Sequence, residues 1–253
     1  MSLGCTEFAV PGRTLLEKLR TLESYGMWLE LVNDGKKQLR DVLDALRNCS
    51  APIWSVQAYK LHELQLLGAG EGERKAAVRH VEETVEMASE VGAKNVVTTL
   101  AYGQPAVKNP REKCVELYRH FGELGERFNV VVSIEPLGRD RTNFLPGVSE
   151  VHRLVRDVDS PNVRLMADTM HIHANGEDVA EVVAEYASEM MELQLRDTGS
   201  RPPGQGEIHF APVLKAVREK FKGLLCLEYQ PGPDPLADFA SALEIAGAIS
   251  AAR

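Results

Sequence analysis

Short apolar runs alternate with longer segments of helical periodicity along the chain, and this alternation restricts its fold more than any other feature. Runs such as VVVSI have no polar face, as expected where helices cover both faces of a parallel sheet. Eight such units in 253 residues favour a single (β/α)8 barrel, the TIM barrel, over an open doubly wound sheet. The eight runs are GCTEFAV, MWLELV, APIWSVQAY, NVVTTLAYG, VVVSIEPLG, VRLMADT, MMELQLRDT and GLLCLEYQ.

The segments that follow these runs have the periodicity of amphipathic helices. In the third of them, Val78, Val81, Val85 and Ala88 recur at spacings of three and four residues, which places them on one helix face. We expect such faces to cover the sheet. No linker or low-complexity segment divides the chain, so one domain is predicted over residues 1–253. The predicted helices span residues 14–26, 37–49, 73–91, 110–128, 147–158, 178–187, 210–221 and 234–249.

The composition excludes several classes of protein. Hydrophobic residues make up 44% of the chain, but no run approaches the roughly 18 apolar residues of a membrane span, and the N-terminus lacks the features of a signal peptide. The four cysteines form no CxxC pair, so neither a disulfide framework nor a zinc knuckle is predicted. A net charge of −8 without a basic run argues against nucleic-acid binding. We therefore expect a cytoplasmic protein with no membrane or nucleic-acid partner.

Four late strands end in side chains that carry oxygen donors, namely Glu135, Asp168, Gln194 and Glu228. Active sites of (β/α)8 barrels lie at the carboxyl ends of the strands, so these side chains are expected to converge there. Three converging carboxylates repel one another unless a cation neutralises them. An all-oxygen set suits Mn²⁺ or Mg²⁺, with Co²⁺ or Zn²⁺ as alternatives.

A lone acid at the end of a strand is commonly a cap or an ion-pair partner. The same type of donor at the ends of four strands favours one divalent metal site instead, so Asp168 is predicted to be a ligand rather than a cap.

Further residues are candidates for binding a substrate. His171 follows Asp168 by three residues and is expected to reach the same cavity. Arg201 follows the seventh strand, and its guanidinium suits a carboxylate, a phosphate or hydroxyl groups. Gln57 and Asn143 are candidates for contacts with substrate hydroxyls, with local bonding to the backbone as the alternative role for each.

This set of groups can perform proton transfer beside a carbonyl. A metal that binds the carbonyl and an adjacent hydroxyl stabilises an enediolate. Glu135 and Glu228 lie on strands three apart and are predicted to flank the substrate, one removing a proton and the other returning it. Return to the same carbon from the opposite face is epimerisation, and return to the neighbouring carbon is aldose–ketose isomerisation. Both outcomes remain open.

The segments IEPL, ADTMH, LQLRDTGSRPPGQGEIHF and LEYQP resemble those of the xylose isomerase-like TIM barrels, especially the ketose 3-epimerases and hydroxypyruvate isomerases. The resemblance spans nearly the whole chain and implies, by analogy, a homodimer or homotetramer. The epimerases usually have His where this chain has Gln194, whereas hydroxypyruvate isomerase-like members have Gln. The resemblance implies that His171 and Arg201 contact substrate oxygens and that the metal is held by Glu135, Asp168, Gln194 and Glu228, with the two glutamates also serving as acid and base.

The leading prediction is therefore a metal-dependent isomerase or epimerase of a small sugar or keto acid. The alternative is a lyase or dehydratase that uses the same enediolate but expels a β-substituent, as related inosose dehydratases and C-glycoside-cleaving proteins do. Product mass separates the two, because isomerisation conserves it. The apurinic endonuclease relatives of this barrel need a histidine-rich zinc cluster and a basic face, whereas this chain offers an oxygen-rich set and an acidic balance.

Overall fold

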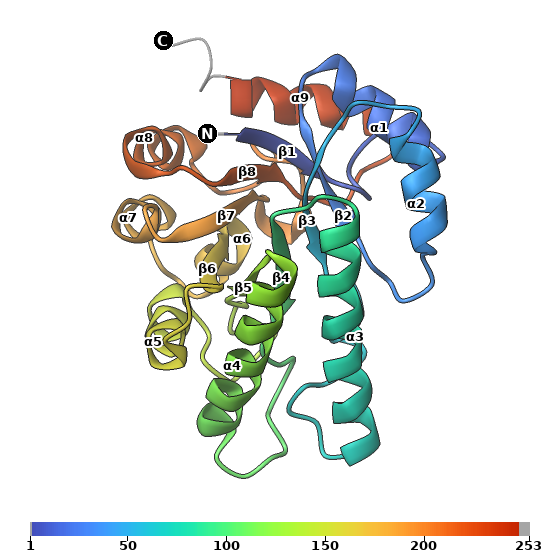
Figure 1. The fold of residues 1–253 in the computed structure, drawn as a ribbon. Coiled ribbons are helices and arrows are strands. Elements are labelled where there is room, and N and C mark those ends of the chain that lie inside the picture. The colour runs from blue at the N-terminus through green and yellow to red at the C-terminus, as the bar shows by residue number, and fades with distance from the viewer. Residues whose placement is uncertain (1, 248–253) are drawn as a thin grey trace.

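Eight parallel strands close into a barrel. Figure 1 labels these strands and the helices around them. Each strand pairs with its neighbour in sequence, and β8 returns to pair with β1. The structure is a computed structural model that describes residues 2–247, and it confirms the predicted (β/α)8 TIM barrel. The strands are β1 (Ser2–Thr6), β2 (Trp28–Val32), β3 (Ile53–Gln57), β4 (Asn95–Thr99), β5 (Val131–Glu135), β6 (Val163–Asp168), β7 (Met190–Leu195) and β8 (Leu224–Leu227).

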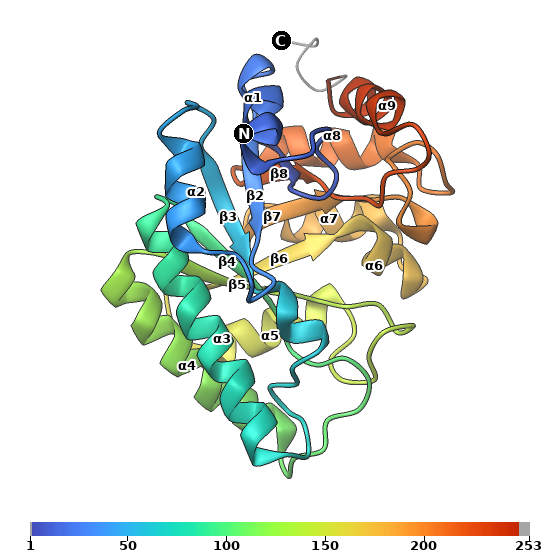
Figure 2. The same cartoon turned by 90° about the vertical axis from the view of Figure 1, so that its right-hand side faces the viewer.

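Helices surround the barrel, and Figure 2 shows them from a second side. All eight predicted helices are present, and a short additional one, α6, follows β6. Residues 248 and 249, the end of the last predicted helix, lie outside the described residues. The helices are α1 (Leu15–Ser24), α2 (Leu39–Leu46), α3 (Glu71–Glu90), α4 (Pro110–Phe128), α5 (Val148–Val158), α6 (Thr169–Ala174), α7 (Val179–Tyr186), α8 (Phe210–Lys220) and α9 (Pro235–Gly247), with 3-10 turns η1 (Tyr59–His62) and η2 (Thr198–Ser200).

The first strand lies earlier in the chain than its apolar run, GCTEFAV, predicts. Ser2 already pairs with Leu224 of β8, so barrel closure extends the strand toward the N-terminus. The strand ends at Thr6, whose carbonyl accepts the N–H of Ala9 in the turn that follows. The apolar residues after Thr6 therefore pack in a loop.

The main core lies between the barrel and its helices. In α3, Val81, Val85 and Ala88 are fully buried and Val78 is partly buried, in agreement with the predicted helix face. Complete burial of one valine side chain contributes about 1.5–3 kcal/mol, so these helix faces hold the outer layer on the barrel. Within residues 2–247, no helix combines the length and the apolar character that crossing a membrane requires.

The carboxyl ends of the strands meet at one rim of the barrel. Gln57 ends β3, Glu135 ends β5, and Glu228 directly follows β8. Asp168 ends β6 and pairs in register with Gln194 of β7. The closed topology therefore brings together polar side chains that are far apart in the sequence.

Candidate active site

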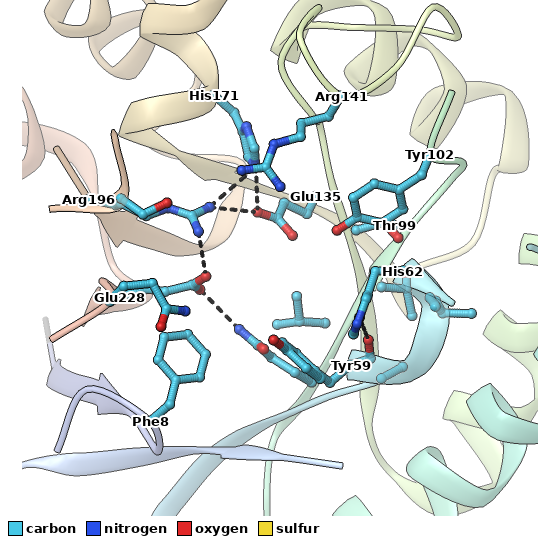
Figure 3. A pocket seen from close by; sticks show the side chains of 17 residues that line it. Phe8, Tyr59, His62, Thr99, Tyr102, Glu135, Arg141, His171, Arg196 and Glu228 are labelled. Atoms are coloured by element: carbon cyan, nitrogen blue, oxygen red, sulfur yellow. Dashed lines mark hydrogen bonds and ion pairs between the residues drawn. The ribbon is translucent and has the colours of Figure 1, made fainter. Parts of the chain in front are cut away.

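A cavity of about 280 Å³ opens at the carboxyl ends of the strands (Figure 3). Gln57, Glu135, His171 and Glu228 line it, so the structure brings these four predicted residues together. The lining also contains side chains that the sequence analysis did not single out as site residues. They include Tyr59, His62, Thr99, Tyr102, Arg196 and Gln230.

Asp168 has two roles, one for each of its carboxylate oxygens. Its Oδ1 atom accepts the backbone N–H of Met170 at 2.7 Å and that of His171 at 3.3 Å, which makes it the N-cap of α6. Its Oδ2 atom contacts Arg196. The prediction that Asp168 is not a cap is therefore wrong, because one oxygen caps the helix while the other remains available to the site.

Burial and mutual repulsion change the acidity of the two glutamates. Burial raises the pKa of Glu135 well above its ordinary value, and the charges of Glu228 and Asp168 raise it further. Burial likewise raises the pKa of Glu228 to about 8, although Arg196 opposes the shift. A carboxyl group whose pKa is about 8, as for Glu228, can both hold and release a proton near neutral pH.

Arg196 occupies the centre of this group of acids. Its Nη2 atom lies 2.5 Å from Asp168 Oδ2 and 3.8 Å from Glu135 Oε1, and its Nη1 atom lies 3.0 Å from Glu228 Oε1. Burial disfavours the charge on the guanidinium, but the three carboxylates outweigh it and raise the pKa of Arg196. The sequence spacing could have indicated that Arg196 belongs to the site. Arg196 follows Gln194 by two positions, which places both side chains on the same face of the extended chain.

His171 lies against the same guanidinium. Its Nε2 atom is 3.2 Å from Arg196 Nη2, and the side chain is almost completely buried. Burial lowers the pKa of His171 to about 4, the charge of Asp168 opposes that shift, and the charge of Arg196 adds to it. A neutral imidazole can accept a hydrogen bond from Arg196 through Nε2.

A second polar layer fills the barrel interior next to the acids. Glu30 of β2 is fully buried and accepts hydrogen bonds from Thr6 Oγ1 at 2.5 Å, Gln57 Nε2 at 3.0 Å and Gln194 Nε2 at 3.1 Å. The Nε2 atom of Gln57 also donates to Glu228 Oε2 at 3.0 Å. Gln57 therefore connects the interior layer to an acid that lines the cavity.

Glu192 of β7 belongs to the same interior layer. Its Oε2 atom accepts a hydrogen bond from Asn95, and burial followed by the charge of Glu30 raises its pKa well above the ordinary value. Glu192 and Glu30 therefore form a buried pair of acids inside the barrel, in which the charge of Glu30 favours the protonated form of Glu192. Both acids lie in the middle of apolar runs, WLELV and MMELQL, where a buried charge is costly unless it has partners.

Asp197 fixes the loop that follows β7. Its carboxylate accepts four backbone N–H groups, those of Thr198, Gly204, Gly206 and Ile208, at 2.8 to 3.1 Å. A Cβ atom at position 206 would lie 2.1 Å from Asp197 Oδ1, so this close approach requires glycine. The glycines of the segment PPGQG therefore allow the loop backbone to approach the Asp197 carboxylate closely.

Comparison with known proteins agrees with this architecture. The sequence profile of the family described as "Xylose isomerase-like TIM barrel" matches residues 17–246. The chain belongs to that family.

Among relatives of this xylose isomerase-like barrel, the 3-dehydro-D-guloside 4-epimerase of Escherichia coli (strain K12) is 22% identical over 244 residues, covering 90% of this chain and 92% of the relative. A putative hydroxypyruvate isomerase of Streptomyces coelicolor is 31% identical over 120 residues, covering 44% and 43%. A solved structure of the IOLI protein with a bound zinc atom has a TM-score of 0.81 at 16% identity and covers 98% of each chain.

The donor set of this family member fits a divalent ion, with one condition. Oxygens of Glu135 and Asp168 and a nitrogen of His171 lie within 4.8 Å of one another, and the buried Gln194 Oε1 atom has no hydrogen-bond partner among the described residues. The oxygens are hard donors of the kind that bind Mg²⁺ or Mn²⁺, and the imidazole nitrogen is a donor that suits Zn²⁺. The condition is that the guanidinium of Arg196 leaves its position between the carboxylates.

Two predicted substrate-binding residues lie outside the cavity. Arg201 is exposed, and its side chain donates to the carbonyl of Thr198 at 2.9 Å. Asn143 is also exposed, and its backbone N–H donates to the carbonyl of Gly103. Their loops, rather than the strand ends before them, determine where these side chains lie.

Proposed function

We propose that this chain is a divalent-metal-dependent isomerase or epimerase of a small sugar or keto acid. The observation that carries the proposal is that two buried glutamates of raised pKa, Glu135 and Glu228, face one cavity from strands three apart in the barrel. Such a pair suits removal of a proton on one side of a substrate and its return on the other. The names of the relatives, an epimerase and an isomerase, support the same class of reaction.

The metal would be held by Glu135, Asp168, Gln194 and Glu228. When bound, it would supply positive charge to stabilise negative charge that develops on substrate oxygens.

The side chains around the glutamates support proton transfer in other ways. Gln57 donates to Glu228 Oε2 and so fixes the orientation of that carboxyl group. His171 remains neutral to well below neutral pH, because its pKa is about 4, and can therefore donate or accept a hydrogen bond at a substrate oxygen. Burial of both glutamates keeps bulk water from competing for the proton that they exchange with the substrate.

The cavity supports a small polyhydroxylated or keto-acid substrate. Its volume of about 280 Å³ lies near the lower limit of ligand pockets. Thr99, Tyr102, His62 and Gln230 supply hydroxyl, imidazole and amide groups that can bind substrate oxygens, and the ring of Tyr59 adds an apolar surface.

Turnover in D₂O tests the proposal. Purified protein supplied with Mn²⁺ is incubated with ketoses, 2-keto acids and their phosphates, and products are analysed by mass spectrometry and NMR. Proton transfer through a carboxyl group predicts that solvent deuterium appears at the reacting carbon of a product isomeric with the substrate. Product without deuterium would indicate a hydride shift and contradict the proton-transfer assignment. Loss of a substituent would indicate the alternative, a lyase or dehydratase.

A further inference from the structure

The guanidinium group of Arg196 lies where an ion held by the same carboxylates would lie. Its nitrogens are 2.5 Å from Asp168 Oδ2 and 3.0 Å from Glu228 Oε1. Oxygen ligands bind hard divalent ions at about 2.0–2.6 Å. An ion at such distances from both oxygens would overlap the guanidinium nitrogens, and the two positive charges would repel. The two cations therefore exclude each other.

Arg196 is incompletely satisfied where it lies. A guanidinium has N–H donors on all three nitrogens, and the buried Nε atom of Arg196 has no hydrogen-bond partner among the described residues. The side chain forms part of the cavity wall (Figure 3), so rotation about its bonds carries the charged group into a space of about 280 Å³. Arg196 can therefore move without opening the hydrophobic core.

The charge balance explains why Arg196 lies among these carboxyl groups. The carboxyl groups of Glu135, Asp168 and Glu228 are all buried, and each has an oxygen within 3.8 Å of a guanidinium nitrogen of Arg196. One guanidinium compensates part of their charge through ion pairs with all three. A divalent ion brings twice that charge to the same oxygens.

We propose that Arg196 and the divalent ion are alternative occupants of this carboxylate centre, so that binding of the ion displaces the guanidinium into the cavity. The inference rests on the proposed metal site. It makes Arg196 a residue that sets metal affinity by competition, and it makes the metal-free protein a folded state with its own internal cation.

Measurement of Mn²⁺ binding to the Arg196→Gln variant tests this exchange. Glutamine removes the competing charge, so Mn²⁺ is expected to bind at least tenfold more tightly than to the wild-type protein in calorimetric titration. The metal-free variant is expected to melt at a lower temperature than the metal-free wild type, because its carboxyl groups have lost their cation. A purely structural role of Arg196 would instead weaken both stability and metal binding.

Two further variants control the measurement. Arg196→Lys keeps the charge but cannot bridge two carboxylates as a planar fork, so its Mn²⁺ affinity is expected between those of the wild type and Arg196→Gln. Arg141→Gln removes another guanidinium from the cavity wall, one that is partly exposed and pairs with Asp140. Its Mn²⁺ affinity is expected to stay within about twofold of wild type because exposed charges are screened.

The outcomes separate the exchange from the proposed function. Equal or weaker Mn²⁺ binding by Arg196→Gln, with wild-type binding intact, would overturn the exchange and leave the metal site standing. No binding by either protein would overturn both. If Arg196→Gln does not fold, Arg196→Lys decides: tighter binding than wild type supports the exchange, and unchanged or weaker binding overturns it.

Discussion

The amide nitrogen of Gln194 donates to both carboxylate oxygens of Glu30, at 3.1 and 3.3 Å. The Gln194 nitrogen therefore faces Glu30, and the Oε1 atom of the same amide is turned away. That oxygen is buried and has no hydrogen-bond partner among the described residues. Glu30 therefore determines which end of the Gln194 amide is available as a ligand.

Glu30→Gln no longer fixes the orientation of the Gln194 amide, because a neutral amide at position 30 can face Gln194 with either its nitrogen or its oxygen. We expect Mn²⁺ affinity to fall about 10–100-fold, the effect typical of groups that orient a ligand. Calorimetric titration measures it. The matched control is Glu192→Gln, which replaces the other buried acid of this layer with an amide of nearly the same shape. Wild-type affinity in Glu30→Gln, or an equal loss in both variants, would contradict the assignment.

Glu135→Gln and Glu228→Gln keep an oxygen donor but remove the proton carrier. We expect turnover to fall by about 10²–10⁴-fold in each, with Mn²⁺ binding partly retained. One variant is also expected to exchange the substrate proton with D₂O without forming product, because its remaining glutamate still begins the reaction. The exposed Glu123 provides the control substitution, Glu123→Gln. Near-normal turnover in either active-site variant would exclude that residue as acid or base.

Removal of the metal is expected to abolish turnover, and Mn²⁺ is expected to restore it. Chelation followed by elemental analysis and activity measurement checks this, and full activity in protein shown to be metal-free would refute it. Gln194→His places a nitrogen among the donors and is expected to shift preference toward Zn²⁺ or Co²⁺. Unchanged metal preference would indicate that Gln194 is not a ligand.

His80 predicts acid sensitivity of the fold. Burial, followed by the charge of Lys60, lowers its pKa in the folded protein from 6.5 to about 4. As the pH falls, His80 therefore binds a proton in the unfolded chain before it does so in the folded protein. The stability of the fold with respect to this group is complete above pH 6.5 and is lost as the pH falls toward 4. We expect protonation of this buried side chain to lower the free energy of unfolding by about 2 kcal/mol.

Urea unfolding at pH 7 and pH 4.5 measures this effect. His80→Gln should lose less unfolding free energy between the two pH values than the wild type does. The exposed His209 supplies the control, His209→Gln, which should retain the wild-type dependence. Identical pH dependence in His80→Gln and the wild type would show that His80 does not cause the loss.

Asp197→Asn should destabilise the loop after β7, because an amide group would replace one oxygen that now accepts backbone N–H groups. Loss of one hydrogen bond to a charged group lowers the free energy of unfolding by about 1.5–3 kcal/mol. We expect a lower melting temperature and faster proteolysis within residues 198–208, measured by calorimetry and limited digestion. The exposed Asp157 is a suitable control position. Resistance to proteases equal to that of the wild type would argue against this anchoring role.

The sequence predicted the barrel because hydrophobic periodicity is a local property, and each of the eight units has it. For a related reason it predicted that Glu135 and Glu228 lie at the same rim: parallel strands end there, so a residue's place on its strand determines its height in the barrel. The residues it missed depend on contacts between distant segments. The long side chain of Arg196 reaches its position through carboxylates on three other strands.

Loop residues were harder to place from sequence. Arg201 lies four residues after Asp197, whose hydrogen bonds fold the loop and leave that arginine at the surface. Asn143 lies in a loop that pairs with the segment around Gly103. In both loops a backbone contact, absent from any local pattern, decides where the side chain lies.

One carboxylate oxygen of Asp168 caps α6 and the other contacts Arg196, and these two contacts together restrict which amino acids position 168 tolerates. Asparagine or serine would preserve the start of α6 but offer the centre no negative charge, whereas glutamate would carry the charge on a longer stem that fits the cap poorly. A substitution at this position can therefore leave α6 and the fold intact while removing one carboxylate from the proposed metal site. Position 168 is accordingly a place where the stability of the helix start and the charge of the carboxylate centre can be changed separately.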